Sequence, residues 1–322
     1  MSKVTKNWLI VAASLTVVGG IIFAGVMTVL KWDFLKLDIR KFETNIHVIA
    51  EEFDNISIKA KTADIDFVPT ENGECKVVCY EQAKVKHSIS VENGTLTVSV
   101  VDERKWYDYI KIFSFKTPKI TVYLPEGQYG ALNIKDSTGD VDIPKGFDFQ
   151  SIDISASTGN VDVFASANDQ LKIDVSTGHI RVEDISAGVL QLSTSTGDIF
   201  VNSVNCTGEV RVNVSTGDIK FSDVNCDSIT SSGSSTGDVS LSNVIVNGRL
   251  SLKTSTGDIK LNRCDAAELF MQTDTGDVTG SLISEKVFIT KTDTGDVKVP
   301  KTITGGRCEI TTDTGDIEIT IN

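Results

Sequence analysis

The sequence predicts an all-β protein, a parallel β-solenoid (β-helix) with coils of 19–20 residues, preceded by one N-terminal transmembrane helix. Three observations support this fold class. A short motif recurs at a nearly constant interval, apolar and polar residues alternate between its copies, and the 23-residue stretch from Trp8 to Leu30 carries no charge. No apolar stripe at helical spacing competes with the alternation in the repeats.

The recurring motif is Thr-Gly-Asp or a near variant of it. The residue before Thr is Ser as far as Ser255 and Asp after it, and the residue after Gly is Asp except at Asn160 and His179. Glycine permits the positive φ of a sharp corner, and Ser, Thr or Asp side chains can cap the backbone groups freed there. The ten corner glycines, 19 or 20 residues apart, are Gly139, Gly159, Gly178, Gly197, Gly217, Gly237, Gly257, Gly276, Gly295 and Gly315.

Between the corners, apolar residues recur at every second position, as in Val210-x-Val212-x-Val214. This period is typical of strands with one buried and one solvated face. A two-strand unit of this length cannot close a sheet alone, but identical units can stack, so residues 137–322 are expected to form the solenoid. Residues 31–136 show the same alternation more loosely and are interpreted as a juxtamembrane segment and an N-terminal β cap, in which Thr62-Ala63-Asp64 looks like a decayed corner.

The uncharged stretch at residues 8–30 is long enough to cross a membrane as a helix, at 1.5 Å per residue about 34 Å. Trp8 and Trp32 lie at its ends, where indoles favour the headgroup region. A cleaved signal peptide is the alternative, but it would have a shorter apolar region and a small-residue cleavage site, which does not follow Leu30. We expect residues 1–7 in the cytoplasm, residue 31 onward outside, and contact with membrane lipid through the helix.

The charge distribution excludes one class of partner. The chain has a net charge of −13, and residues 137–322 account for all of it, with 14 basic and 27 acidic side chains. Such a surface has no excess of cations to neutralise phosphates, so nucleic acid is not expected as a partner. Acidic residues at the corners would also keep a long β-rod soluble.

The segment from Ile120-Thr121-Val122-Tyr123-Leu124-Pro125 into the first corner, Ser137-Thr138-Gly139-Asp140, resembles the bacterial DUF4097 family. These are β-strand-repeat proteins, including LiaG/YvlB-like envelope proteins, and they are often labelled adhesins. The resemblance covers about residues 40–322 and implies a β-solenoid, commonly behind a membrane segment. It implies no catalytic residues. Asn160, His179 and the change from Ser to Asp before the last three corners depart from the repeated pattern.

The last three corners are the best candidate metal site in the sequence. Carboxylates stacked at this spacing repel, so each must be solvated, accept a backbone N–H, or share a cation, for which Ca²⁺ suits an all-oxygen ligand set. A solvated acidic turn is the alternative, and no other cofactor is expected. The six candidate ligands are Asp274, Asp277, Asp293, Asp296, Asp313 and Asp316.

The chain ends in the short strand containing Ile317, Ile319 and Ile321, with nothing after it to cover the last coil. Unpaired backbone groups at such an edge are a template for adding a strand. We therefore expect a partner or a second copy to dock there, unless Glu318 and the shortness of the strand keep the protein monomeric.

These features favour a membrane-anchored, extracytoplasmic solenoid with a non-catalytic binding role, as an adhesin or a cell-envelope accessory protein. A regulatory partner of a membrane envelope-stress system is the alternative, and a β-helix carbohydrate-active enzyme is a third. An enzyme would need clustered carboxylates and a basic residue in a cleft, whereas here most carboxylates lie one per coil. An envelope protein or a surface glycan would be the partner.

Overall fold

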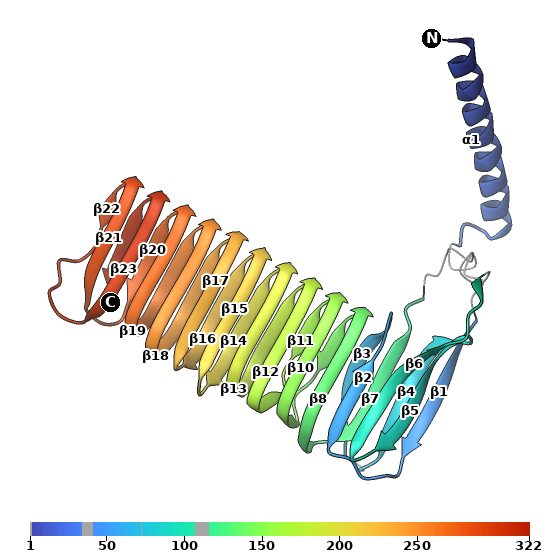
Figure 1. The fold of residues 1–322 in the computed structure, drawn as a ribbon, viewed down its shortest axis with the longest axis horizontal. Coiled ribbons are helices and arrows are strands. Elements are labelled where there is room, and N and C mark those ends of the chain that lie inside the picture. The colour runs from blue at the N-terminus through green and yellow to red at the C-terminus, as the bar shows by residue number, and fades with distance from the viewer. Residues whose placement is uncertain (1, 34–40, 72, 107–115) are drawn as a thin grey trace.

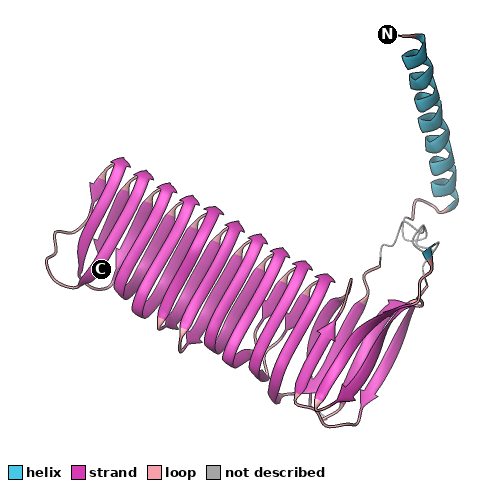
Figure 2. Ribbon diagram, viewed as in Figure 1, coloured by secondary structure: helices cyan, strands magenta, loops and turns pink. Residues whose placement is uncertain are grey.

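The computed structural model describes residues 2–33, 41–71, 73–106 and 116–322. Helix α1 (Lys3–Val29) begins after Ser2, whose hydroxyl accepts the Thr5 N–H. It is long and apolar enough to cross a membrane, and its most apolar window has no residue buried against the rest of the protein. The chain is otherwise almost entirely β (Figure 2). A membrane anchor and a signal sequence both agree with this helix.

The β-strands form a parallel β-solenoid, as the sequence predicts (Figure 1). Each coil has one strand segment before the Thr-Gly-Asp corner and one after it, and equivalent residues of successive coils pair in register, as Leu192 does with Val212 and Ile199 with Ile219. The strands from the first corner onward are β8 (Gly127–Thr138), β9 (Val141–Ile143), β10 (Phe147–Thr158), β11 (Val161–Val163), β12 (Ser166–Thr177), β13 (Ile180–Thr196), β14 (Ile199–Cys206), β15 (Glu209–Thr216), β16 (Ile219–Cys226), β17 (Ser228–Thr236), β18 (Val239–Thr256), β19 (Ile259–Thr275), β20 (Val278–Leu282), β21 (Lys286–Thr294), β22 (Val297–Lys298), β23 (Gly306–Thr314) and β24 (Ile317–Ile321).

The core is a set of apolar columns that run along the solenoid. The residue two positions after the corner glycine always has a β-branched aliphatic side chain. This side chain is at most 1% exposed in every coil except the outermost one, at the C-terminal end of the rod. Each such side chain therefore packs between its equivalents in the coils on either side, which favours a stack over an isolated coil. This column consists of Val141, Val161, Ile180, Ile199, Ile219, Val239, Ile259, Val278, Ile317 and, half-exposed in the last coil, Val297.

The corner requires glycine for two reasons. Gly217 has φ +141°, and a Cβ placed on it would lie 2.1 Å from the carbonyl oxygen of Gly197 in the preceding coil. The same overlap recurs at Gly159, Gly178 and Gly257. Backbone conformation and close stacking of the coils therefore both exclude a side chain at this position.

The N-terminal part is joined to the rod without a boundary. Strands β2 (Asn55–Lys59) and β3 (Asp64–Thr70) form a coil that pairs in parallel with β8 and β9, so the solenoid starts before residue 137 and β8 runs through that expected boundary. Thr62–Asp64 is its corner. The cap is built by the other strands of this region, which are β1 (Phe42–Ile49), β4 (Cys75–Gln82), β5 (Val85–Glu92), β6 (Thr95–Asp102) and β7 (Lys119–Pro125).

Two sheets of the cap extend the two sides of the first coil. Strands β6 and β7 pair in parallel with β2 and β3, and antiparallel strands then complete the end, β5 on β6 and β4 followed by β1 on β7. The change from parallel to antiparallel pairing ends the stacking of coils at this end.

At the other end, the order of strands in space differs from their order in the sequence. Strand β23 lies between β19 and β21, and β24 pairs with β20 on one side and with β22 on the other. The expectation that Ile317, Ile319 and Ile321 form the terminal edge is therefore wrong in its topology. Ile317 is fully buried and Ile319 is 2% exposed, because β24 lies between β20 and β22. After β20 the chain forms the outermost coil first, and its last segment then occupies the position between that coil and the coil of β20.

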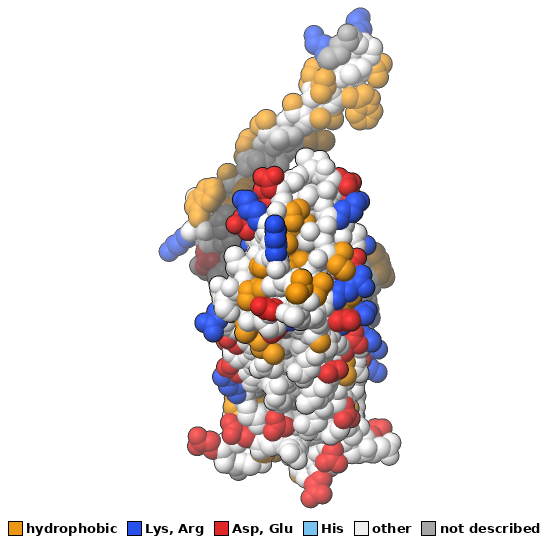
Figure 3. All heavy atoms as spheres, turned by 90° about the vertical axis from the view of Figure 1, so that its left-hand side faces the viewer, with side chains coloured by type: hydrophobic (Ala, Val, Ile, Leu, Met, Phe, Trp, Pro, Cys, Tyr) orange, Lys and Arg blue, Asp and Glu red, His pale blue; other side chains and the backbone are white. Residues whose placement is uncertain are grey.

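Strands β21 and β22 form the true last coil of the rod, since β21 pairs with β23, β22 pairs with β24, and no other described strand lies beyond them. The outward side chains Val287 and Ile289 of β21 are 37% and 48% exposed, and Ile303, in the loop between β22 and β23, is 91% exposed. Figure 3 shows this end of the rod, where apolar side chains gather among charged ones.

Candidate binding groove on the solenoid

The residues after the corner glycines form a continuous hydrogen-bonded ladder. The backbone N–H of each one donates to the side chain of its equivalent in the neighbouring coil, at 2.7–3.1 Å. Asp64 begins the ladder, because its Oδ1 atom accepts the Asp140 N–H. The decayed corner that the sequence suggests therefore has the same hydrogen-bonding role as the later corners. In spatial order the ladder consists of Asp64, Asp140, Asn160, His179, Asp198, Asp218, Asp238, Asp258, Asp277, Asp316 and Asp296.

This ladder explains the two departures from Asp. The Oδ1 atom of Asn160 accepts the His179 N–H at 3.1 Å, and the Nδ1 atom of His179 accepts the Asp198 N–H at 3.0 Å. What the position requires is therefore a short side chain with an acceptor atom, not a negative charge. The aspartates have a structural role that the sequence pattern alone did not assign to them.

The six aspartates proposed as calcium ligands divide into two groups. Asp277, Asp316 and Asp296 are consecutive in the ladder, in that order, so one oxygen of Asp277 and one of Asp316 already accept a backbone N–H. Asp274, Asp293 and Asp313, before the threonines, are exposed, and Asp293 pairs with Lys291 at 3.2 Å. Among the described residues, no three of the six bring ligand atoms within 4.8 Å of one another. Calcium binding at these corners stays a prediction.

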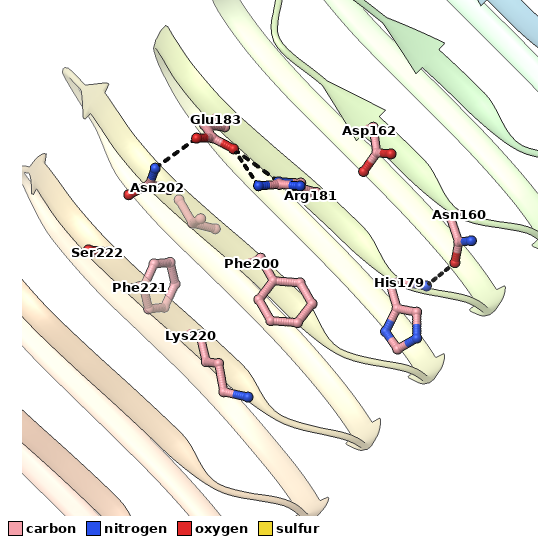
Figure 4. Close-up of a pocket in the computed structure, with 11 residues that line it drawn as sticks. Asn160, Asp162, His179, Arg181, Glu183, Phe200, Asn202, Lys220, Phe221 and Ser222 are labelled. Carbon is pink, nitrogen blue, oxygen red and sulfur yellow. Dashed lines mark hydrogen bonds and ion pairs between the residues drawn. The ribbon is translucent and has the colours of Figure 1, made fainter.

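A groove of about 560 Å³ lies on the outer face of the strands that follow the corners, across β11, β13, β14 and β16 (Figure 4). Outward positions of these strands carry Asp162, Arg181, Phe200 and Lys220 in successive coils. Phe200 is the exception among them, because its ring occupies a phase that the repeat normally gives to a polar side chain. The groove is lined by Asn160, Asp162, His179, Arg181, Glu183, Phe200, Val201, Asn202, Lys220, Phe221 and Ser222.

The Phe200 ring is flanked by two nitrogen-bearing side chains. The His179 ring centroid lies 6.3 Å from that of Phe200, and the Lys220 ammonium lies 5.5 Å from the ring centroid. Lys220 also pairs with Asp218 at 3.1 Å. An ammonium over an aromatic face is attracted by the ring quadrupole, which helps to hold the Lys220 chain beside Phe200.

Hydrogen bonds fix the polar side of the groove. Glu183 accepts from Arg181 at 2.9 Å and from the Asn202 amide at 3.0 Å. Burial raises the pKa of Asp162, although Arg181 opposes that rise. The groove therefore presents one outward apolar ring, that of Phe200, beside donors and acceptors whose positions are set by their neighbours. This combination is typical of binding sites for polar ligands.

Sequence reasoning missed this groove. The available signal was an aromatic residue at an outward position, Phe200, where the neighbouring coils have Arg181 and Lys220. The side chains around it come from four coils, so their proximity depends on the stacking register that only the structure gives.

The six cysteines are all free, and Cys206 and Cys226 lie in the core, as small buried thiols rather than a disulfide.

Comparisons with known proteins place the chain in a family. The model of the family described as Toastrack DUF4097 matches residues 53–213 and 207–322. Comparison with curated proteins gives no match. The solved structures that match include candidate adhesins from Bacteroides fragilis (16% identity, TM-score 0.44, covering 87% of this chain and 97% of that one) and Parabacteroides distasonis (11%, 0.44, 87% and 98%). A third, described as a candidate lipid-binding protein from Parabacteroides distasonis, has 16% identity, a TM-score of 0.42, and coverage of 87% and 97%. On the family match, which spans more than half of its length, this protein belongs to the Toastrack DUF4097 family.

Proposed function

We propose that this protein is a membrane-anchored, extracytoplasmic binding rod without catalytic activity, and that the groove around Phe200 binds a glycan of the cell surface or envelope. The single observation that carries the proposal is the outward Phe200 ring, which lies among polar side chains in a groove whose other apolar lining residues, Val201 and Phe221, are buried in the core. An adhesin and an envelope accessory protein would both use such a site.

The chemistry of the groove suits a saccharide. The C–H face of a sugar ring is weakly positive and packs against the negative face of an aromatic ring, while its hydroxyls both donate and accept hydrogen bonds. Arg181, Asn202 and Glu183 supply donors and an acceptor on fixed strands next to that ring. A ligand that lies along the rod would cross these side chains from one coil to the next.

Helix α1 supports the membrane-anchored part of the proposal. With residues 1–7 inside the cell and residue 31 onward outside, the groove would face the envelope, where glycans are found. Basic residues lie on both sides of the apolar stretch, Lys3 and Lys6 before it and Lys31 after it, so the charge difference does not set the orientation. A large domain can be translocated despite such charges.

The proposal is tested with the full-length protein in detergent micelles on an array of neutral and anionic oligosaccharides. We expect Phe200→Ala to weaken binding at least tenfold, because stacking on the ring is lost. Phe270→Ala is the matched control, since Phe270 is also an outward aromatic ring but lies between Arg249 and Arg307, away from the groove. Equal loss in both variants, or no glycan bound by the wild type, contradicts the proposal.

Two further readouts separate the alternatives. Release of new reducing ends from a bound polysaccharide would show catalysis and overturn the non-catalytic part of the proposal. Cross-linking in intact membranes that recovers one specific membrane protein, and does so equally with Phe200→Ala, would favour the role as a regulatory partner in envelope stress.

A further inference from the structure

A buried cluster of three metal-ligating side chains lies in the cap, remote from the groove in sequence. Cys79 and Glu81 project inward from β4, and His87 projects inward from β5. All three are buried, and one ligand atom from each lies within 4.8 Å of the others. Among the described residues, this is the one group of three or more His, Cys, Asp or Glu side chains that meets so closely.

The carboxylate of Glu81 is held in place by its neighbours. Its Oε2 atom accepts the His87 backbone N–H and lies 2.7 Å from His87 Nδ1, while its Oε1 atom accepts the Asn45 amide at 2.6 Å. At 1% exposure, a carboxylate needs compensation by such partners. A hydrogen bond from an amide to a carboxylate oxygen is also the arrangement that commonly orients a metal ligand.

We propose that Cys79, Glu81 and His87 bind a divalent transition metal ion, most simply Zn²⁺. In this site the thiolate and the carboxylate contribute one negative charge each and the imidazole is neutral, so a divalent ion makes the buried cluster neutral. Sulfur and nitrogen ligands together with one carboxylate favour Zn²⁺ over Ca²⁺, which takes oxygen ligands.

The geometry requires only small movements. With bonds of about 2.0–2.3 Å, the ligand atoms of a tetrahedral zinc ion lie about 3.3–3.8 Å apart. The neutral ring would carry its proton on Nε2. The ion would then take the place of the proton between His87 Nδ1 and Glu81 Oε2, and these two atoms would separate by less than about 1 Å. A cysteine binds a metal ion as the thiolate, so binding also displaces the thiol proton of Cys79, which passes to solvent.

One of the three ligands, His87, borders a cavity that Cys79 and Glu81 do not line. His87 lines this cavity of about 150 Å³ together with Lys61, Gln82, Val85 and Arg104, among others. A water molecule takes about 30 Å³ of liquid volume, so the cavity can supply a water ligand. Three protein ligands and one water complete a tetrahedral zinc site.

The position of the cluster indicates what the metal would do. Strands β4 and β5 pair with each other only at Gln82 and Val85, beside the turn that joins them. Beyond that pair, β4 continues the sheet that contains β7 and β3, whereas β5 continues the sheet that contains β6 and β2. An ion held by both strands links the two sheets at the N-terminal end of the rod, where stacking of coils has ended. The site is therefore structural, and it is independent of glycan binding at Phe200.

Cobalt is the probe that tests this proposal, because a Co²⁺–thiolate bond gives a strong near-ultraviolet charge-transfer band. The reduced full-length protein in detergent micelles is titrated with Co²⁺ and then with Zn²⁺. We expect one equivalent of Co²⁺ to produce the band, Zn²⁺ to remove it, and Zn²⁺ to raise the melting temperature relative to chelator-treated protein.

Cys79→Ala is compared with Cys308→Ala, which truncates another fully buried cysteine that belongs to no such cluster. We expect the first to abolish the band and to weaken Zn²⁺ binding at least tenfold, and the second to retain both. No band in the wild type, or a band that survives in Cys79→Ala, overturns the proposal and leaves a buried Glu81–His87 pair. The wild-type titration decides the matter even if Cys79→Ala does not fold.

Discussion

The backbone N–H of Asp198 donates a hydrogen bond to Nδ1 of His179 at 3.0 Å, so a histidine serves as one rung of a ladder otherwise built from Asp and Asn. This role requires a lone pair on Nδ1 and hence a neutral ring with its proton on Nε2. The Asp198 carboxylate also lies 3.5 Å from Nδ1, where it would attract a protonated ring. His179 is thus both a structural residue of the corner and a wall of the groove.

We expect His179→Asp to keep the stability of the wild type, because aspartate supplies the acceptor found at the neighbouring corners. His179→Leu leaves the Asp198 N–H without that acceptor, and the exposed corner should limit the loss to about 1 kcal/mol in the free energy of unfolding. Urea denaturation of both variants measures this. Equal stability of the leucine and aspartate variants would show that the ladder contributes nothing at this rung.

Two glycines with the same φ separate backbone strain from close packing. Gly139 and Gly127 both have φ +155°, but a Cβ on Gly139 would lie 2.1 Å from the Ala63 carbonyl oxygen, whereas a Cβ on Gly127 meets no atom within 4 Å. We expect Gly127→Ala to cost about 1–3 kcal/mol through strain alone, and Gly139→Ala to cost at least about 1–3 kcal/mol more through overlap. Thermal denaturation of the pair gives the difference. Similar losses would mean that the corner needs glycine for its φ alone.

The buried carboxyl of Asp136 makes stability depend on pH. This side chain is 7% exposed, and neither oxygen has a hydrogen-bond partner among the described residues that meets ordinary geometry. Burial raises its pKa to about 6, against smaller opposing effects of the nearby Ser137 and Thr138 N–H groups. The folded state holds the proton more tightly than the unfolded chain. The loss in free energy of unfolding that ionisation of Asp136 causes is therefore absent below about pH 4. It grows as the pH rises and is complete above the folded-state pKa of about 6.

Asp136→Val should therefore stabilise the protein at pH 7.5 by about 2–3 kcal/mol and much less at pH 4. Valine suits this inward position, since Val175 and Val214 occupy it in later coils. Asp148→Val is the control, because it removes the carboxylate of an exposed aspartate instead of a buried one. A gain from Asp136→Val that is the same at both pH values would contradict a buried, ionised carboxylate.

The fold could be predicted from the sequence because the repeat is local. A corner glycine every 19–20 residues and inward residues at every second position determine the coil, and stacking in register then follows from repetition. The ladder was only one of three possibilities for the acidic corners, since the sequence does not say which acceptor a backbone N–H will find. From the sequence, Asn160 and His179 are only departures from the repeated Asp. The structure shows that each supplies an acceptor atom to the ladder.

The order of the last coils could not be predicted for a physical reason. The spacings from Gly257 to Gly276, Gly295 and Gly315 are ordinary, and a segment of 19 residues can rise two levels of the stack as well as one. The sequence of β24 contains no feature that indicates that β22, and not β24, lies at the end of the rod. The groove around Phe200 and the cluster around Cys79 depend in the same way on contacts between separate strands.

The strand β21, rather than the end of the sequence, is where we expect a second copy to dock. Val287 and Ile289 are exposed on it, and its outer backbone edge pairs with no described strand. Residues 137–322 hold 14 basic and 27 acidic side chains and would repel a second copy, but residues 283–305 hold four basic and three acidic ones, a net charge of +1. The end of the rod is thus the part of the solenoid where self-association meets least repulsion.

Sedimentation of the full-length protein in detergent micelles over a range of concentrations tests this expectation. We expect a reversible dimer that Ile289→Lys shifts to monomer, because the added charges face each other across the twofold interface. Ile46→Lys is the matched control, since Ile46 on β1 is 64% exposed at the opposite end of the rod. A wild type that stays monomeric at every concentration, or a dimer lost equally in both variants, would show that this edge does not join two copies.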